Sequence, residues 1–239
     1  MELALPEKAP GKDDEMIKNI AALIPALNAE ATVREVVSGT KRHISDVLVI
    51  DDGSDDDTGP RAREGGARVI RHEARRGKGA ALVAGFSSLL KSGYDAILTL
   101  DADGQHDPND IPGLVRAYDA RRPGIIVGSR MSSREDIPRY RLIPNLVGNM
   151  FISLATGKRI EDSQSGMRVY SRELLSSITL TSTGYDTETE ALIKAGRAGF
   201  DIVFVPIRTI YKTGQESHFR PVRDTYRISI TYLRCLFID

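Results

Sequence analysis

Long apolar runs are absent from this sequence. No stretch reaches the roughly 18 to 20 apolar residues that a membrane-spanning helix needs. The nearest approach, Leu142–Ala155, is too short and is interrupted by Pro144, Asn145 and Asn149. The first residues are polar and acidic, without the apolar core of a signal peptide. We therefore expect a protein that does not span a membrane, although it can lie on one.

The sequence also has only one cysteine and a formal net charge of zero. The single cysteine, Cys235, excludes an intramolecular disulfide and suits a reducing compartment. The 33 Lys and Arg residues balance 33 Asp and Glu residues, so no overall field attracts nucleic acid or an acidic membrane. At 41% hydrophobic and 28% charged, the composition is that of a globular protein with a sizeable core. Local patterns must therefore indicate the function.

The apolar runs that are present lack alternation and are separated by helical stretches. Strands are expected at Asn19–Pro25, Asp46–Ile50, Ala67–Arg71, Ala96–Leu100, Ile125–Gly128, Ile202–Val205 and Arg208–Tyr211, with an extended piece at Arg168–Tyr170. One helix is expected to begin at Asn28–Thr32, and others to cover Gly79–Lys91, Asp110–Arg121, Tyr140–Thr156 and Tyr185–Ala198. Strands covered on both faces predict an α/β fold with a mostly parallel central sheet flanked by helices.

Two pairs of acidic residues follow two of these strands directly. Asp51 and Asp52 end one strand, and Asp101 and Asp103 end another. In open α/β sheets, ligands bind beyond the carboxyl ends of the strands. Carboxylate oxygens suit Mg²⁺ or Mn²⁺, which usually take one or two protein carboxylates together with substrate phosphates. The pattern predicts a metal and diphosphate site, whereas an isolated Asp-x-Asp is more often a solvated turn.

Five motifs occur in order along the chain: VIDDGSDDDT (49–58), RRGKGAAL (75–82), LDADGQHDP (100–108), VGSR (127–130) and DSQSGMRVYSR (162–172). Together they resemble glycosyltransferase family 2, and within it the branch of dolichol-phosphate mannose synthase and bacterial polyprenyl-phosphate glycosyltransferases. The resemblance runs from about Ile20 to about Asp224. It implies a GT-A fold, a nucleotide diphosphate sugar donor (a UDP- or GDP-sugar), a divalent metal and inversion at the anomeric carbon.

The resemblance also implies roles for the acidic residues. Asp101 and Asp103 match the family motif that binds the metal and the diphosphate, with Gln105 as a third ligand to Mg²⁺ or Mn²⁺. Asp51 and Asp52 match the positions that contact the base and ribose of the nucleotide. A carboxylate can accept hydrogen bonds from a base N–H or a ribose hydroxyl there.

A further donor-binding loop departs from the family pattern. Pro25, Asn28 and Glu30 lie where the family has a P-x-Y-N-E-E type of loop, and are assigned to the nucleotide. This sequence reads PALNAE, with Leu27 in place of the aromatic and Ala29 in place of the first Glu. Base stacking is correspondingly weakened.

Two basic residues fall within the motifs. Lys78 precedes a helix whose N-terminus favours anions, so it is assigned to the donor. The spacing around it is not that of a P-loop. Arg130 follows the strand at Ile125–Gly128, where it can meet a phosphate or an acidic partner, and it is assigned to the catalytic set.

The loop at Asp162–Arg168 is polar and suits donor sugar and acceptor. By resemblance, Gln164 and Arg168 line the active site, and Ser165 contacts the acceptor. In family 2, the position matching Glu188 and Glu190 often supplies the base for hydroxyl acceptors. We assign Glu190 to the catalytic set and leave the choice between the two open. Helix capping explains both acids equally well. A phosphate acceptor needs no base, because it is already an anion.

The last segment resembles the membrane-proximal part of polyprenyl-phosphate transferases. His218, Arg220 and Arg223 are expected to bind a lipid phosphate, ahead of a helix with opposed basic and apolar faces. The chain is thus divided into a flexible tail at 1–16, a GT-A catalytic domain at 17–215 and an amphipathic helix at 216–239. Leu142–Ala155 is a second candidate for contact with a membrane.

The leading hypothesis is transfer of a sugar to polyprenyl phosphate by a cytoplasmic protein held peripherally on the cytoplasmic face of a membrane. One alternative keeps the donor chemistry but transfers to a saccharide hydroxyl in cell-surface polysaccharide synthesis. Another is a nucleotide-sugar binding protein without turnover. A nucleotidyltransferase fits less well, because no glycine-rich phosphate loop follows the first strand. The oligomeric state, a homo-oligomer included, stays open.

Overall fold

The computed structural model describes residues 19–131, 139–208 and 210. The strands are β1 Ile20–Ala26, β2 Val47–Asp51, β3 Arg68–Arg71, β4 Ala96–Thr99, β5 Ile125–Ser129, β6 Arg168–Ser171 and β7 Ile202–Pro206. The helices are α1 Val33–Lys41, α2 Thr58–Glu64, α3 Lys78–Lys91, a 3₁₀ turn η1 Pro108–Asp110, α4 Ile111–Arg121, α5 Arg139–Thr156, α6 Arg172–Ser177 and α7 Thr187–Arg197.

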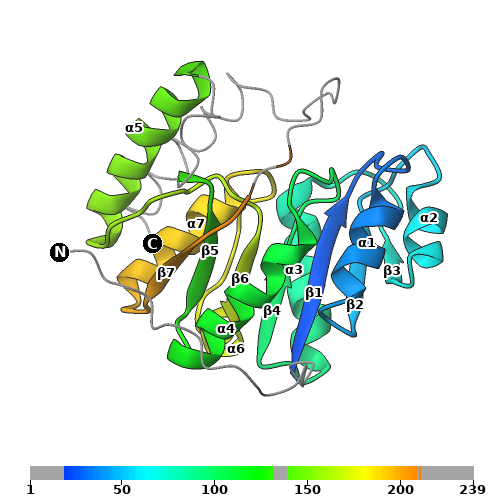
Figure 1. Cartoon of the computed structure of the whole chain (residues 1–239), viewed down its shortest axis with the longest axis horizontal. Coiled ribbons are helices and arrows are strands. Elements are labelled where there is room, and N and C mark those ends of the chain that lie inside the picture. The colour runs from blue at the N-terminus through cyan, green and yellow to red at the C-terminus, as the bar shows by residue number, and fades with distance from the viewer. Residues whose placement is uncertain (1–18, 132–138, 209, 211–239) are drawn as a thin grey trace.

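The described strands form one sheet in the order β3-β2-β1-β4-β6-β5-β7 (Figure 1). β1 runs parallel to β2 and β4, and β5 runs parallel to β7. β6 is antiparallel to both of its neighbours, with Thr99 opposite Arg168 and Val127 also opposite Arg168. Because β6 is reversed, its first residue lies at the edge of the sheet where β4 and β5 end. The sheet is therefore mostly parallel, as predicted.

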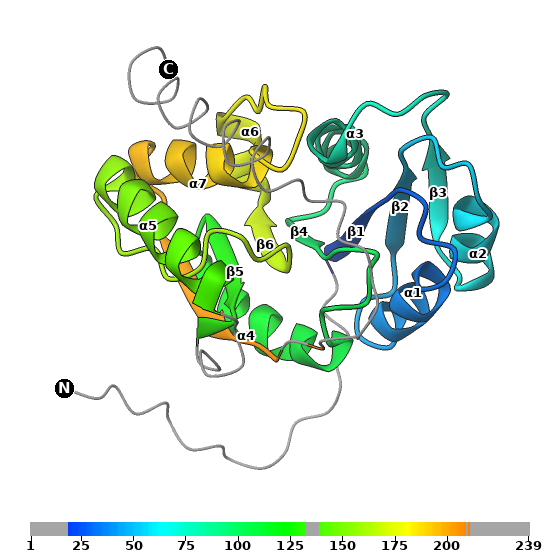
Figure 2. The same cartoon turned by 90° about the horizontal axis from the view of Figure 1, so that it is seen from above.

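Helices cover both faces of the sheet. Figure 2 shows α1, α2 and α4 on one side and α3, α6 and α7 on the other. Each side has its own apolar core, one built with α1 and α4 and the other with α3 and α7. In α1 the buried residues Val33, Val36, Val37 and Thr40 recur at the helical spacing, which places one stripe against the sheet. The α/β prediction is confirmed.

Some local predictions need correction. α2 and α6 are short helices that the apolar pattern did not predict. The strand expected at Arg208–Tyr211 is not formed in its described part, because β7 ends at Pro206 and neither Arg208 nor Ile210 is in a strand. The predicted tail and the predicted C-terminal helix lie outside the described residues. Within the part that is described, no helix is long and apolar enough to cross a membrane.

Candidate active site

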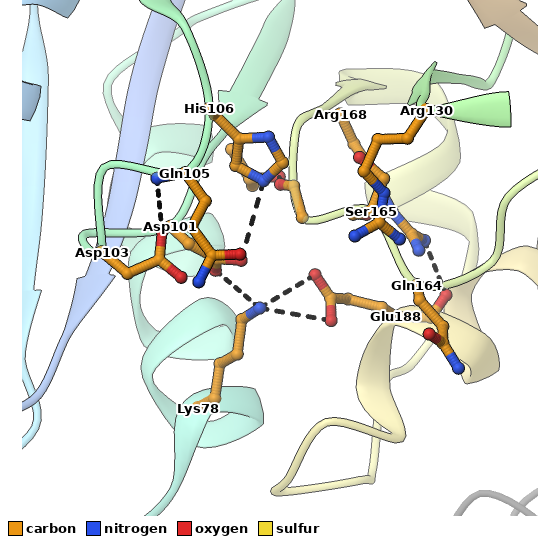
Figure 3. A network of polar contacts seen from close by, with 12 residues as sticks. Lys78, Asp101, Asp103, Gln105, His106, Arg130, Gln164, Ser165, Arg168 and Glu188 are labelled. Carbon is orange, nitrogen blue, oxygen red and sulfur yellow. Dashed lines mark hydrogen bonds and ion pairs between the residues drawn. The ribbon is translucent and has the colours of Figure 1, made fainter. Parts of the chain in front are cut away.

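The carboxyl edge of the sheet gathers side chains from distant parts of the sequence. The loop after β4 brings Asp101 and Asp103, and the first residue of α3 is Lys78. The loop before β6 arrives at the same edge because β6 is antiparallel. Glu188 is the second residue of α7. Figure 3 shows these side chains converging.

At the centre of this cluster lies the ammonium group of Lys78. Its Nζ is 2.6 Å from Oδ1 of Asp101 and 3.2 and 3.3 Å from the two carboxylate oxygens of Glu188. It also lies 5.2 Å from the centre of the Tyr185 ring, within cation–π range. Burial alone would lower the pKa of Lys78, but Asp101 and Glu188 outweigh it and raise the pKa, so the ammonium stays charged.

Asp101 and Asp103 lie together with Gln105 and His106 in the loop that follows β4. His106 Nε2 is 3.8 Å from Asp101 Oδ2. Burial would raise the pKa of Asp101, but Lys78 and His106 lower it below its ordinary value. Burial and the charge of Asp101 raise the pKa of Asp103. The carboxylates of Asp101 and Asp103 repel each other, and a cation between them would relieve that repulsion.

The donor set of this loop fits a hard divalent cation. Two carboxylates and the side-chain amide of Gln105 supply oxygen ligands, which Mg²⁺ and Mn²⁺ prefer. No group of three or more His, Cys, Asp and Glu side chains suited to a metal occurs in the described ranges. A metal bound here would therefore take only part of its coordination shell from this loop. That arrangement suits a metal which also binds substrate phosphates.

Arg130 forms a two-point ion pair with Asp162. Its Nε and Nη2 are each 2.9 Å from one oxygen of that carboxylate. Asp162 also accepts hydrogen bonds from the backbone N–H groups of Gln164 and Ser165. Arg130 thus meets the acidic partner that was one of its two predicted alternatives, and the pair fixes the loop that carries Gln164 and Ser165. Gln164 is exposed at this edge, whereas Ser165 is buried, with no hydrogen-bond partner for its Oγ.

Arg168 is placed differently from the prediction. Its side chain is fully buried and donates hydrogen bonds to the carbonyl oxygens of Ser163, Ser165 and Glu188. A fully buried guanidinium that donates to three backbone carbonyls does not line a substrate site. Its position instead ties the 163–165 loop to the start of α7.

Glu190 also departs from the prediction, since it faces away from Lys78. Its buried carboxylate accepts hydrogen bonds from the N–H groups of Thr181 and Ser182 and from the Thr181 hydroxyl, and it pairs with Lys194 at 3.1 Å. Burial opposes ionisation, but the hydrogen bonds from Ser182 and the others lower the pKa of Glu190. Glu188 is therefore the acid of this helix that lies in the site.

Asp51 and Asp52 are buried beneath the loops that they hold. Asp51 accepts a hydrogen bond from the Ser54 N–H and pairs with Arg71 at 3.2 Å. Asp52 accepts from the N–H groups of Arg76 and Gly77, and its Oδ1 lies 2.8 Å from His72 Nδ1. These contacts occupy the carboxylates that were predicted to contact the base and ribose. In this conformation the two carboxylates stabilise the turns after β2 and before Lys78.

The loop after β1 joins the same region. Pro25 is buried in β1, whereas Asn28 and Glu30 are exposed. Asn28 and Glu30 accept hydrogen bonds from the N–H groups of Asp55 and Asp57, so the two loops brace each other. His218, Arg220 and Arg223, the predicted acceptor residues, lie outside the described residues.

Two contributors were missed from the sequence. The pairing of Asp162 with Arg130 has no local signal, because the two residues lie 32 positions apart. Tyr185, beside the Lys78 ammonium, was seen only as the start of a helix. One signal was available: a lysine at the first position of a helix is unfavourable for the helix dipole and needs an anionic neighbour.

A family model described as glycosyl transferase family 2 matches residues 21–179. The chain belongs to glycosyltransferase family 2. It is a glycosyltransferase, with the sheet and flanking helices of the GT-A fold. The match spans β1, β2, β4 and β5, whose carboxyl ends carry the candidate site.

Named relatives cover most of the chain. The UDP-N-acetylglucosamine–dolichyl-phosphate N-acetylglucosaminyltransferase of Methanococcus voltae is 33% identical across 81% of this chain and 86% of that relative. The polyprenol monophosphomannose synthase of Mycolicibacterium smegmatis is 32% identical across 84% of this chain and 82% of that relative. Glucosyl-3-phosphoglycerate synthase from Mycobacterium tuberculosis, crystallised with Mn²⁺, uridine diphosphate and glucosyl-3-phosphoglycerate, gives a TM-score of 0.74. The match covers 98% of this chain and 88% of that structure, at 24% sequence identity. At this identity the similarity shows a shared fold only.

Proposed function

We propose that this protein transfers a sugar from a nucleotide diphosphate donor to a polyprenyl phosphate, with inversion at the anomeric carbon. The observation that carries the proposal is the cluster of Asp101, Asp103 and Lys78 at the carboxyl edge of the sheet. Acidic and basic groups side by side suit a metal-bound diphosphate, which presents both a cation and anionic oxygens. The names of the relatives support the acceptor class.

Asp101, Asp103 and Gln105 would hold Mg²⁺ or Mn²⁺. When bound there, the ion would neutralise part of the charge that develops on the diphosphate leaving group. Lys78 adds a second positive charge from the protein itself. Its ammonium is largely enclosed, and a preorganised charge in a partly dry site stabilises a developing anion better than one in water.

The acceptor side needs orientation more than it needs a base. A phosphate monoester is already an anion at neutral pH, so one of its oxygens can attack the anomeric carbon directly. Attack from the face opposite the leaving diphosphate inverts the configuration at that carbon. The loop held by Arg130 and Asp162 exposes Gln164 at this edge, where it can orient the sugar or the acceptor.

Peripheral contact with a membrane is part of the proposal. On α5 the exposed side chains of Leu146, Met150, Phe151 and Leu154 form an apolar row. The opposite side of the helix, with Ile152 buried, packs against α7. Exposed apolar rows on helices mark contact surfaces, and a lipid acceptor requires the enzyme to work at a bilayer.

The decisive experiment is an acceptor panel. The protein is incubated with UDP- and GDP-sugars, Mn²⁺ and a short-chain polyprenyl phosphate, and lipid-linked sugar is detected by mass spectrometry. Product should form with one donor class, and chelation of the metal or Asp101→Asn should remove at least about 99% of it. Saccharide acceptors are tested in parallel. Transfer to a saccharide hydroxyl and to no lipid phosphate would reject the proposed acceptor while leaving the donor chemistry standing.

A further inference from the structure

Lys78 occupies a position that its own helix disfavours. It is the first residue of α3, where the helix dipole repels positive charge. Its side chain is only 13% exposed. A buried charge is tolerated only when charged or hydrogen-bonding groups surround it. The anions that hold this ammonium in place must therefore come from other elements.

Glu188 supplies one of those anions, and its whole carboxylate group contacts Lys78. Both of its carboxylate oxygens face the Lys78 Nζ, at 3.2 and 3.3 Å, and its side chain is 7% exposed (Figure 3). A general base must present a free lone pair to the incoming hydroxyl. Here an ammonium group lies in front of both oxygens, so an incoming hydroxyl would have to compete with Lys78 for this carboxylate.

The backbone is built to bring the starts of α3 and α7 together. The N–H of Gly79 donates to the carbonyl oxygen of Thr183 at 3.0 Å. A side chain at Gly79 would meet the Thr183 carbonyl carbon at 2.7 Å and would clash with the hydroxyl of Thr187. Only glycine permits this approach, which places Lys78 and Glu188 within contact of each other across 110 positions of sequence.

We infer that Glu188 is a positioning residue for the donor: it holds the Lys78 ammonium beside Asp101, where Lys78 contacts the donor diphosphate, and it does not act as the base. This inference rests on the proposed donor chemistry and deepens it. Asp101 belongs to the set that would hold the metal, so its charge is shared. Glu188 lies outside that set, and both of its carboxylate oxygens contact Lys78.

Nucleotide binding without any acceptor tests this role. UDP and GDP, each with Mn²⁺, are titrated by calorimetry into the wild type, Lys78→Met, Glu188→Gln and the double variant. Loss of one charged hydrogen-bonded partner is expected to weaken binding by about 10-fold or more. If Glu188 acts through Lys78, the double variant should bind the nucleotide within about 2-fold of Lys78→Met alone.

Steady-state kinetics provide the second readout. Glu188→Gln should raise the KM for the donor more than it lowers kcat, because donor binding is the step affected. Glu188→Asp, which keeps the charge, should recover part of the affinity. Glu173→Gln, an exposed acid in the first turn of α6, is the matched control and should bind nucleotide like the wild type.

The outcomes separate this inference from the proposed function. Unchanged nucleotide affinity in Glu188→Gln, with kcat reduced by about 100-fold or more, would assign Glu188 as a base and overturn the inference. Additive losses in the double variant would also overturn it. If the wild type binds neither nucleotide with Mn²⁺, the donor chemistry itself fails. Thermal unfolding of each variant identifies any loss of fold, and Glu188→Asp then carries the test.

Discussion

Arg130 and Asp162 form a two-point ion pair, with both contacts at 2.9 Å, between the end of β5 and the loop that precedes β6. The carboxylate is fully buried, and it also accepts the backbone N–H groups of Gln164 and Ser165. One acidic side chain thus fixes the arginine and the loop together. The shape of the loop that carries Gln164 and Ser165 depends on this pair.

Asp162→Asn should lower the free energy of unfolding by about 3 kcal/mol at neutral pH, because it leaves a partly buried guanidinium without its charge partner. Urea unfolding measures this change. Asp119→Asn is the control, since Asp119 and Arg122 form an exposed surface pair that contributes about 0–1 kcal/mol. Equal losses in the two variants would contradict the assigned importance of the buried pair.

The stabilisation by Asp162 should also depend on pH. Burial opposes ionisation, but Arg130 outweighs it and holds the pKa of Asp162 below its ordinary value. The contribution is therefore complete above the unfolded-state pKa of about 3.9 and is lost as the pH falls through the lower, folded-state pKa. The difference in unfolding free energy between the wild type and Asp162→Asn should be constant from pH 7 to pH 5 and shrink below about pH 4. A difference that grows on acidification would have the wrong sign.

Glu190→Gln should destabilise the protein but should not remove a catalytic base. The carboxylate accepts three hydrogen bonds from Thr181 and Ser182 groups, and an amide would present N–H donors to some of the same N–H groups. We expect a loss of about 1.5–3 kcal/mol in unfolding free energy, with kcat within about 3-fold of wild type below the unfolding transition. Glu173→Gln again serves as the exposed control. A collapse of kcat in a fully folded Glu190→Gln would restore the predicted catalytic role.

Gly166→Ala should impair the site more than the fold. A side chain there would collide with the carboxylate of Asp101. Asp101 is a proposed ligand of the metal, and a displacement of about 1 Å can cost about 100-fold in rate, so we expect at least a 10-fold loss of sugar transfer measured with Mn²⁺. Gly148→Ala is the matched control, because a side chain there meets open space on α5. Equal activity in the two variants would contradict the tight packing of Gly166 on Asp101.

Polar substitution of the apolar row on α5 should weaken membrane binding. The triple change of Leu146, Met150 and Leu154 to Ser removes three exposed apolar side chains, each worth about 1.5–3 kcal/mol if fully buried in lipid. Co-sedimentation with phospholipid vesicles should fall by at least about 10-fold. Ile70→Ser and Val83→Ser, exposed apolar positions on β3 and α3, should leave it unchanged. Equal vesicle binding by the triple variant would reject α5 as the contact surface.

Much of the fold follows from local pattern. The stretches Val47–Ile50 and Ala96–Leu98 contain no polar residue, and burial on both faces explains that composition. Strand ends are equally local, since a carboxylate directly after a buried strand lies at the carboxyl edge of the sheet. Asp101 and Asp103 could therefore be placed from sequence. The reversal of β6 could not, because direction depends on pairing with β4 and β5 and not on the composition of the strand.

The sequence by itself determined the α/β class, the family and the loop with Asp101 and Asp103. Tertiary structure decided what each charged side chain faces. Residues two apart on a helix point about 200° apart, so only the packing of α7 could show that Glu188 meets Lys78 while Glu190 faces Thr181. Burial of Arg168, Asp51 and Asp52 was equally hidden, because folding brings in their partners, which are backbone groups together with the side chains of Arg71 and His72. A charged residue in a motif can be found in the sequence, whereas the group that it pairs with is known only from the folded structure.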